Sequence, residues 1–85
     1  MALTPIKLEL EPQADAAYAV FSEDEIKRTK KLDSYRLLDL DAQGEVVGIE
    51  FLRVSQGVDL SDLPRRGELR TLFDEHHIKR MPTGG

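Results

Sequence analysis

The hydrophobic pattern of the chain changes its period once, after Gly57, and this change constrains the fold more than any other feature. Before it, apolar and charged residues alternate over residues 6–10, and a β-branched run covers residues 46–54. A period of two is typical of a strand with one buried face. After it, a stripe with the i, i+3, i+4, i+7 spacing of one helix face consists of Leu69, Leu72, Phe73 and His76. The sequence therefore predicts an α+β fold.

The first part of the chain is predicted to form a small antiparallel β-meander of four to five strands over residues 6–54. Pro12 ends the first strand, because proline cannot donate a hydrogen bond to a neighbouring strand. The remaining strands are expected over residues 17–21, 26–32, 35–40 and 46–54, with turns at residues 22–25 and 41–44. The lysines and arginines of residues 26–32 suit a sheet edge. The run at residues 46–54 suits the sheet centre.

One C-terminal helix is expected over about residues 64–78, after a linker at residues 55–63. Pro64 suits the first turn of this helix, and Asp62 suits a cap nearby. A single domain is therefore predicted over residues 1–80, and residues 81–85 are predicted to form a flexible tail.

The small size of the chain and its lack of cysteine indicate that the fold depends on association. A chain of 85 residues buries only about 60–65% of its unfolded surface, and no disulfide or thiolate-bound metal can brace it. Acidic blocks at residues 1–26 and 37–63 alternate with basic blocks at residues 27–36 and 64–85, which gives complementary patches. We therefore expect a homo-oligomer or a small protein partner.

Several classes of function are not expected. The sequence has no run of about 18 apolar residues, and its start lacks the features of a signal peptide, which predicts a cytoplasmic protein without membrane association. The net charge of −4 argues against a nucleic-acid partner. No nucleophile elbow and no glycine-rich phosphate loop is present, so neither an enzyme nor a cofactor is predicted. Because adjacent helical residues point in different directions, His76 and His77 do not suit chelation, and a partly buried histidine at a helix end is expected.

Two motifs leave alternatives open. Residues 39–50 nearly match the calcium loop of an EF-hand, with Asp39 and Asp41 first and third, Gly44 sixth and Glu50 twelfth. The β-branched residues that follow favour a hairpin turn instead, and no metal site is predicted. The second motif is the terminal Gly84-Gly85, which is also found in ubiquitin-like sulfur carriers. A sulfur carrier is therefore an alternative function.

The order of motifs over about residues 6–54 resembles domain-of-unknown-function family 2283, a family of small bacterial proteins. The resemblance rests on a Pro-x-Ala-Asp-Ala-x-Tyr element after the first strand, an Asp-x-x-Gly turn and a Val-Gly-Ile-Glu strand. The motif residues, whose role in the family is unknown, are Pro12, Asp15, Tyr18, Asp39, Asp41, Gly44, Gly48 and Glu50.

What the resemblance implies is a hairpin turn at Asp41–Gly44 and no known catalytic, cofactor or metal residue. It also implies a place in a two-gene module beside a toxin-like protein. Together with the small core, it leads us to predict a non-enzymatic protein-interaction module.

Overall fold

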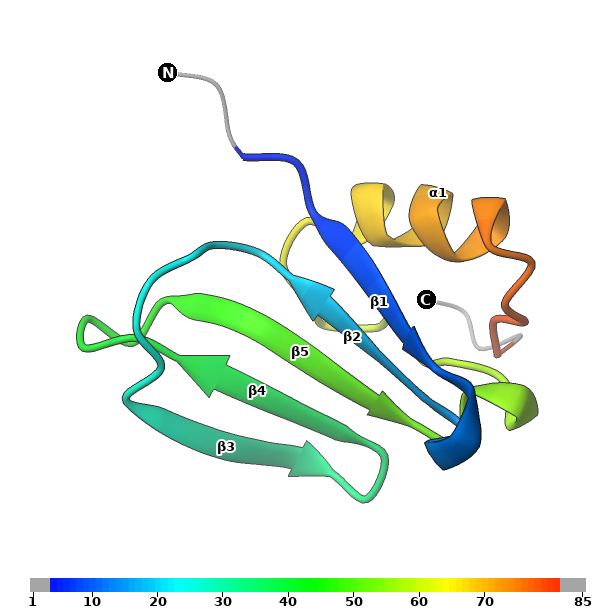
Figure 1. Ribbon diagram of the computed structural model, residues 1–85, viewed down its shortest axis with the longest axis horizontal. Helices are drawn as coiled ribbons and strands as arrows, with labels where there is room; N and C mark the ends of the chain where they lie inside the picture. Colours follow the sequence, from blue (N-terminus) through cyan, green and yellow to red (C-terminus); the bar gives the residue numbers. More distant parts are fainter. Residues whose placement is uncertain (1–3, 82–85) are drawn as a thin grey trace.

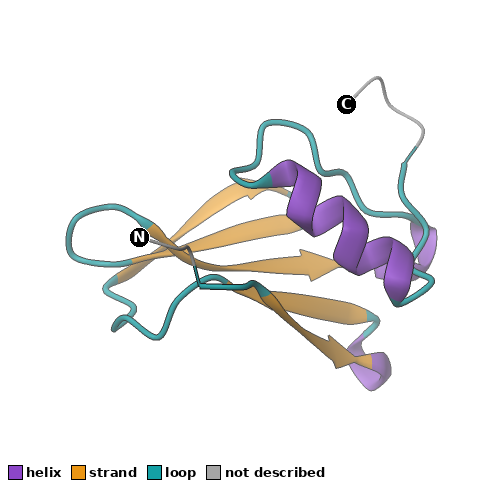
Figure 2. Ribbon diagram, turned by 90° about the horizontal axis from the view of Figure 1, so that it is seen from above, coloured by secondary structure: helices purple, strands orange, loops and turns teal. Residues whose placement is uncertain are grey.

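A five-stranded antiparallel sheet carries one helix on one of its faces (Figures 1 and 2). The computed structural model describes residues 4–81. Of the predicted tail only Met81 is therefore described, and Gly84-Gly85 lie outside the described residues. The strands are β1 (Lys7–Glu11), β2 (Ala16–Val20), β3 (Arg28–Asp33), β4 (Arg36–Leu40) and β5 (Val46–Leu52), and the helix is α1 (Arg66–Glu75). The predicted α+β class, with an antiparallel sheet and one C-terminal helix, is confirmed.

The strand order is β1-β2-β5-β4-β3, which departs from a simple meander at one connection. Residues 21–27 carry the chain from β2 around the end of the sheet to β3, past β5 and β4 (Figure 1). The Phe21 N–H donates to the Val47 carbonyl (2.7 Å) and the Lys27 N–H to the Leu40 carbonyl (2.8 Å), so both ends of this connection are held. As a result, the most β-branched strand, β5, lies at the centre, and the basic β3 lies at an edge, as their compositions predict.

Short 3-10 turns follow two of the strands. The first, η1 (Pro12–Ala14), begins at the proline that ends β1, and the second, η2 (Val54–Gln56), follows β5. The predicted strand at residues 46–54 therefore ends earlier, at Leu52, where Arg53 takes a left-handed conformation with φ 55°.

The helix is shorter at both ends than the pattern predicts. It begins at Arg66 because Arg65 takes a left-handed conformation with φ 53°, and Asp62 has φ 61°. Pro64 and Asp62 therefore lie before the helix, and neither forms its first turn or its cap. At the other end, His76 is exposed and its Nδ1 lies 2.8 Å from the Leu72 carbonyl. The prediction of a partly buried histidine was wrong, although His76 does stand at the helix end.

The core lies between the helix and the sheet. Leu69 and Phe73 are the buried residues of α1, and the Phe73 ring packs edge-to-face against Phe51 of β5 with centroids 5.0 Å apart. Ala17 and Ala19 of β2 and Ile49 of β5 complete the sheet side of this cluster, together with Phe51. Among the described residues, no helix is both long and apolar enough to cross a bilayer.

A buried arginine joins the sheet to the segment that leads to the helix. Arg36 at the start of β4 is only 7% exposed. Its Nη1 donates to the carbonyls of Asp59 (3.1 Å) and Ser61 (2.8 Å), while Nε donates to the Asp33 carboxylate (2.9 Å). Because this guanidinium satisfies two carbonyls of an irregular segment, it positions residues 59–61 over the sheet.

Candidate functional site

The face of the sheet opposite the helix carries two cross-strand rows of mainly polar residues. Side chains alternate between the two faces of a strand, so the residues between Ala17, Ala19, Ile49 and Phe51 point away from α1. The first row runs through Glu9, Tyr18, Glu50, Leu37 and Lys31. The second row runs through Lys7, Val20, Gly48, Asp39 and Thr29. We call this surface the uncovered face.

Tyr18 links the two rows. Its register partner on β5 is Glu50, but its ring leans over Gly48, where a Cβ would overlap the tyrosine hydroxyl and ring. The hydroxyl then donates to Asp39 Oδ2 (2.6 Å), and the Thr29 hydroxyl donates to Asp39 Oδ1 (2.6 Å). Burial, and then the bond to Asp39, raises the pKa of Tyr18 far above its usual value, so this phenol stays a hydrogen-bond donor.

Glu50 stands beside other carboxylates on the same face. Its Oε2 is buried and has no hydrogen-bond partner within residues 4–81. Burial raises the pKa of Glu50 to about 7, and hydrogen bonding and repulsion from Glu11, followed by the charge of Asp39, act in the same direction. Glu50 therefore changes its charge near neutral pH.

Four of the eight motif residues thus meet on the uncovered face: Tyr18, Asp39, Gly48 and Glu50. The Tyr18 side chain is half-buried, and its hydroxyl is hydrogen-bonded. The missing side chain of Gly48 permits the close approach of the Tyr18 ring. The register partners of Glu50 on the two neighbouring strands are Tyr18 and Leu37, so no cation stands directly opposite it.

Pro12 and Asp15 form the connection between β1 and β2 at one end of the sheet. Asp15 takes a left-handed conformation with φ 53°. Its carboxylate accepts hydrogen bonds from the Ser55 N–H (2.9 Å) and hydroxyl (2.7 Å), and its carbonyl accepts one from the Val54 N–H (3.0 Å). Asp15 therefore ties the first hairpin to the turn after β5, forty residues away, instead of capping only its own turn.

Asp41 and Gly44 form the tight turn between β4 and β5. Asp41 Oδ1 accepts hydrogen bonds from the N–H groups of Gln43 and Glu45, both at 2.9 Å, and Gly44 has φ 82°. Strands, not helices, flank this turn, so the hairpin interpretation is confirmed and the EF-hand alternative is wrong. Within residues 4–81 no group of three or more histidines, cysteines or acidic residues has the arrangement of a metal site.

Sequence reasoning missed Thr29 and Glu11 as members of this surface. Neither stands out along the chain, because Thr29 lies ten residues from Asp39, and Glu11 lies almost forty residues from Glu50. Only the strand register brings them together. The alternation of β1 was the one available signal, since it places Glu9 and Glu11 on the same face.

The fold and the motif positions define a small α+β protein with a half-covered antiparallel sheet. The chain belongs to the family described as "Protein of unknown function (DUF2283)", whose model matches residues 7–55. This part holds all five strands and the uncovered face, whereas the helix lies beyond it. No curated protein and no solved structure matches the chain.

Proposed function

We propose that this protein is a non-enzymatic protein-interaction module that binds through its uncovered face. The observation that carries the proposal is the side-chain arrangement there. Tyr18, Thr29 and Asp39 are fixed by short hydrogen bonds, and a buried oxygen of the neighbouring Glu50 carboxyl has no partner in the described part of the chain. Groups held in one geometry lose little conformational entropy on binding.

The charge of the face indicates what kind of group it receives. Glu9, Asp39 and Glu50 stand around Tyr18, and Glu11 stands beside Glu50, whose pKa is raised by burial and then by Glu11 and Asp39. An arginine or lysine of a partner would relieve the repulsion between these carboxylates and donate to Glu50 Oε2, which has no hydrogen-bond partner within residues 4–81. The partner is therefore expected to present a basic side chain.

A second copy of the chain offers one such group. Lys31 lies at the opposite end of the Glu9 row, on the edge strand β3. If two uncovered faces stacked about a two-fold axis parallel to the strands, the Glu9 end of each row would face the Lys31 end of the other. Self-association in the cytoplasm is thus one form of the proposal, and a small basic partner, such as the second protein of a two-gene module, is the other.

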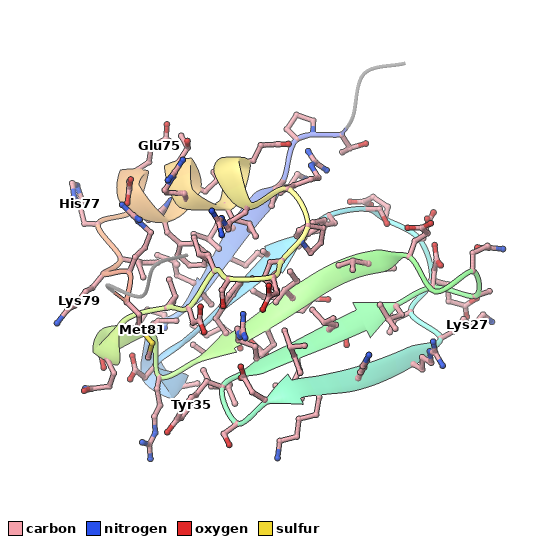
Figure 3. The ribbon with its side chains drawn as sticks, turned by 180° about the vertical axis from the view of Figure 1, so that it is seen from behind. Lys27, Tyr35, Glu75, His77, Lys79 and Met81 are labelled. Carbon is pink, nitrogen blue, oxygen red and sulfur yellow. The ribbon has the colours of Figure 1, made fainter. Side chains whose placement is uncertain are left out.

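Light scattering and co-purification test the proposal with two matched charge reversals. Glu9→Lys changes the uncovered face, and Glu75→Lys changes an exposed helix residue away from it (Figure 3). We expect the wild type and E75K to scatter above the mass of the 9.6 kDa monomer, or to retain one common partner, and we expect E9K to lose that assembly. A wild-type monomer without any E9K-sensitive partner would contradict the proposal.

A further inference from the structure

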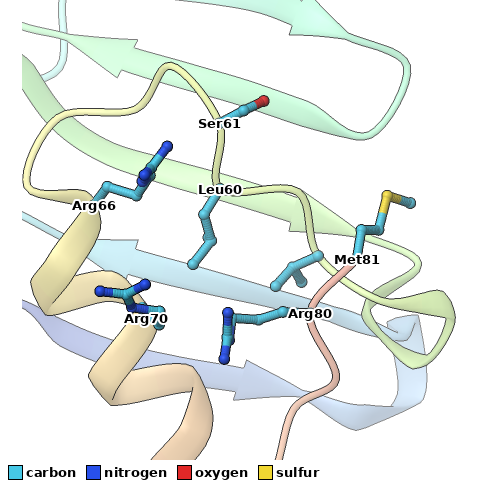
Figure 4. Close-up of a pocket in the computed structure, with 7 residues that line it drawn as sticks. Leu60, Ser61, Arg66, Arg70, Arg80 and Met81 are labelled. Carbon is cyan, nitrogen blue, oxygen red and sulfur yellow. The ribbon is translucent and has the colours of Figure 1, made fainter. Parts of the chain in front are cut away.

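Three arginines line one shallow pocket on the helix side of the molecule, well away from the uncovered face. Arg66 and Arg70 come from α1, and Arg80 comes from the C-terminal segment on the other side of the pocket (Figure 4). The pocket is completed by Val58, Leu60, Ser61 and Met81. Val58 and Leu60 are buried and give it an apolar floor.

The backbone fixes the two sides of this pocket relative to each other. The Val58 N–H donates to the Lys79 carbonyl and the Met81 N–H donates to the Val58 carbonyl, both at 2.8 Å. Arg80 therefore stands in a short parallel bridge opposite Val58. Arg66 and Arg70 are one helical turn apart, so they share one face of α1.

The charges around the pocket are not balanced. Arg80 Nε lies 2.9 Å from Asp74 Oδ1, but neither Arg66 nor Arg70 takes part in an ion pair within residues 4–81. Like charges at i and i+4 repel each other on a helix. Three guanidinium groups against one carboxylate thus leave an excess of two positive charges in a protein whose net charge is −4.

We propose that this pocket binds a phosphate group, either free inorganic phosphate or the phosphomonoester of a larger ligand. A phosphate carries about −1.5 to −2 charges at neutral pH, which matches the excess. Guanidinium groups present paired donors that suit its oxygens. Because the pocket is shallow, the phosphate alone lies between the arginines and the rest of a ligand stays outside.

Titrations with inorganic phosphate and with phenyl phosphate, followed by backbone amide NMR at low salt, test this site on the full chain. We expect saturable shifts around Leu60 and Arg70. Arg70→Gln should weaken binding about tenfold, since it removes one charge-assisted contact. Asp74→Asn should strengthen binding, because it removes the carboxylate that competes for Arg80. The control Arg28→Gln, which removes an equal charge from the exposed edge strand β3, should leave the affinity unchanged.

The outcomes distinguish free phosphate from a phosphomonoester as the ligand, and they also show whether the proposal fails. Equal affinity for both probes assigns the site to the phosphate group alone, and tighter binding of phenyl phosphate assigns it to phosphomonoesters. Shifts that do not saturate would overturn the proposal. So would equal losses in R28Q and R70Q, because the effect would then be one of net charge.

Discussion

Gly48 and Tyr18 show how one glycine can organise a surface. The absence of a side chain at Gly48 lets the Tyr18 ring pack over this position of β5 and reach Asp39 on β4. The family motif therefore pairs two residues for a steric reason that neither shows alone.

Gly48→Ala is expected to lower the free energy of unfolding by about 1–3 kcal/mol, because the new methyl group displaces the Tyr18 ring and breaks its bond to Asp39. Urea denaturation measures this loss. In a Tyr18→Ala background the same substitution should cost much less, since the two residues are in contact.

The control for this experiment is a second glycine-to-alanine substitution. Gly67 lies in the first turn of α1 with nothing near its missing Cβ, so Gly67→Ala should raise stability by up to about 1 kcal/mol. Equal effects of both substitutions on the free energy of unfolding would show that the position of the Tyr18 ring does not depend on Gly48. A Gly48→Ala loss that is as large in the Tyr18→Ala background as in the wild type would show the same.

Glu50 makes stability depend on pH near neutrality. Its pKa is about 7 in the folded protein and near 4.5 when exposed, so the folded state holds its proton more tightly. Below pH 4.5 the carboxyl is neutral in both states and nothing is lost, whereas stability falls as the pH rises from about 4.5 to about 7.

Glu50→Gln should therefore be more stable than the wild type at pH 8 and equal to it at pH 4. Thermal melting across this pH range measures the difference. Glu45→Gln, in the exposed turn between β4 and β5, serves as the control and should follow the wild type. A difference in melting temperature between E50Q and the wild type that stays constant at every pH would argue against the titration of Glu50.

Among the secondary-structure elements, the hydrogen bonds from Arg36 to the Asp59 and Ser61 carbonyls decide where the segment before the helix lies. The Arg36 guanidinium is buried, and hydrogen bonding to it holds the pKa of Asp33 below its usual range. The hydrophobic period predicted the helix but not this connection, because an arginine at a strand start has no distinct pattern. Two residues with left-handed backbone conformations, Asp62 and Arg65, also set the start of the helix at Arg66, whereas the cap and proline signals in the sequence predicted an earlier start.

Arg36→Met should lower the free energy of unfolding by about 2–4 kcal/mol, since it leaves the Asp59 and Ser61 carbonyls and Asp33 Oδ2 without their donor. The control Arg28→Met on the exposed edge strand should change stability by no more than about 0.5 kcal/mol.

The pH dependence of this loss provides a further check. The lowered pKa of Asp33 contributes stability above its ordinary value of 3.8, and this contribution disappears as the pH falls. The difference in the free energy of unfolding between the wild type and R36M should therefore become smaller as the pH falls. A difference that grows would show that Arg36 does not act through Asp33.

At the scale of the whole molecule, one helix covers one face of the sheet, and the other face stays polar and partly buried. Alternating acidic and basic blocks along the chain become an acidic cluster on the uncovered face, a basic edge at β3 and an arginine pocket beside α1. Any assembly through these surfaces depends on charge.

Raising the salt concentration should therefore dissociate an assembly made through the uncovered face, because the Debye length falls from about 10 Å at 0.1 M to about 3 Å at 1 M. Light scattering at the two ionic strengths measures the change. An assembly that grows with salt would indicate an apolar interface instead.

The α+β class, the edge and central strands, the Asp41–Gly44 turn and the family could be predicted from local patterns, because each depends on residues near one another in the chain. The place of β5 between β2 and β4, the bond from Tyr18 to Asp39 and the approach of Glu50 to Glu11 could not. These contacts depend on strand register, which is set by pairing between distant segments, and a slip of one residue would move every side chain to the other face.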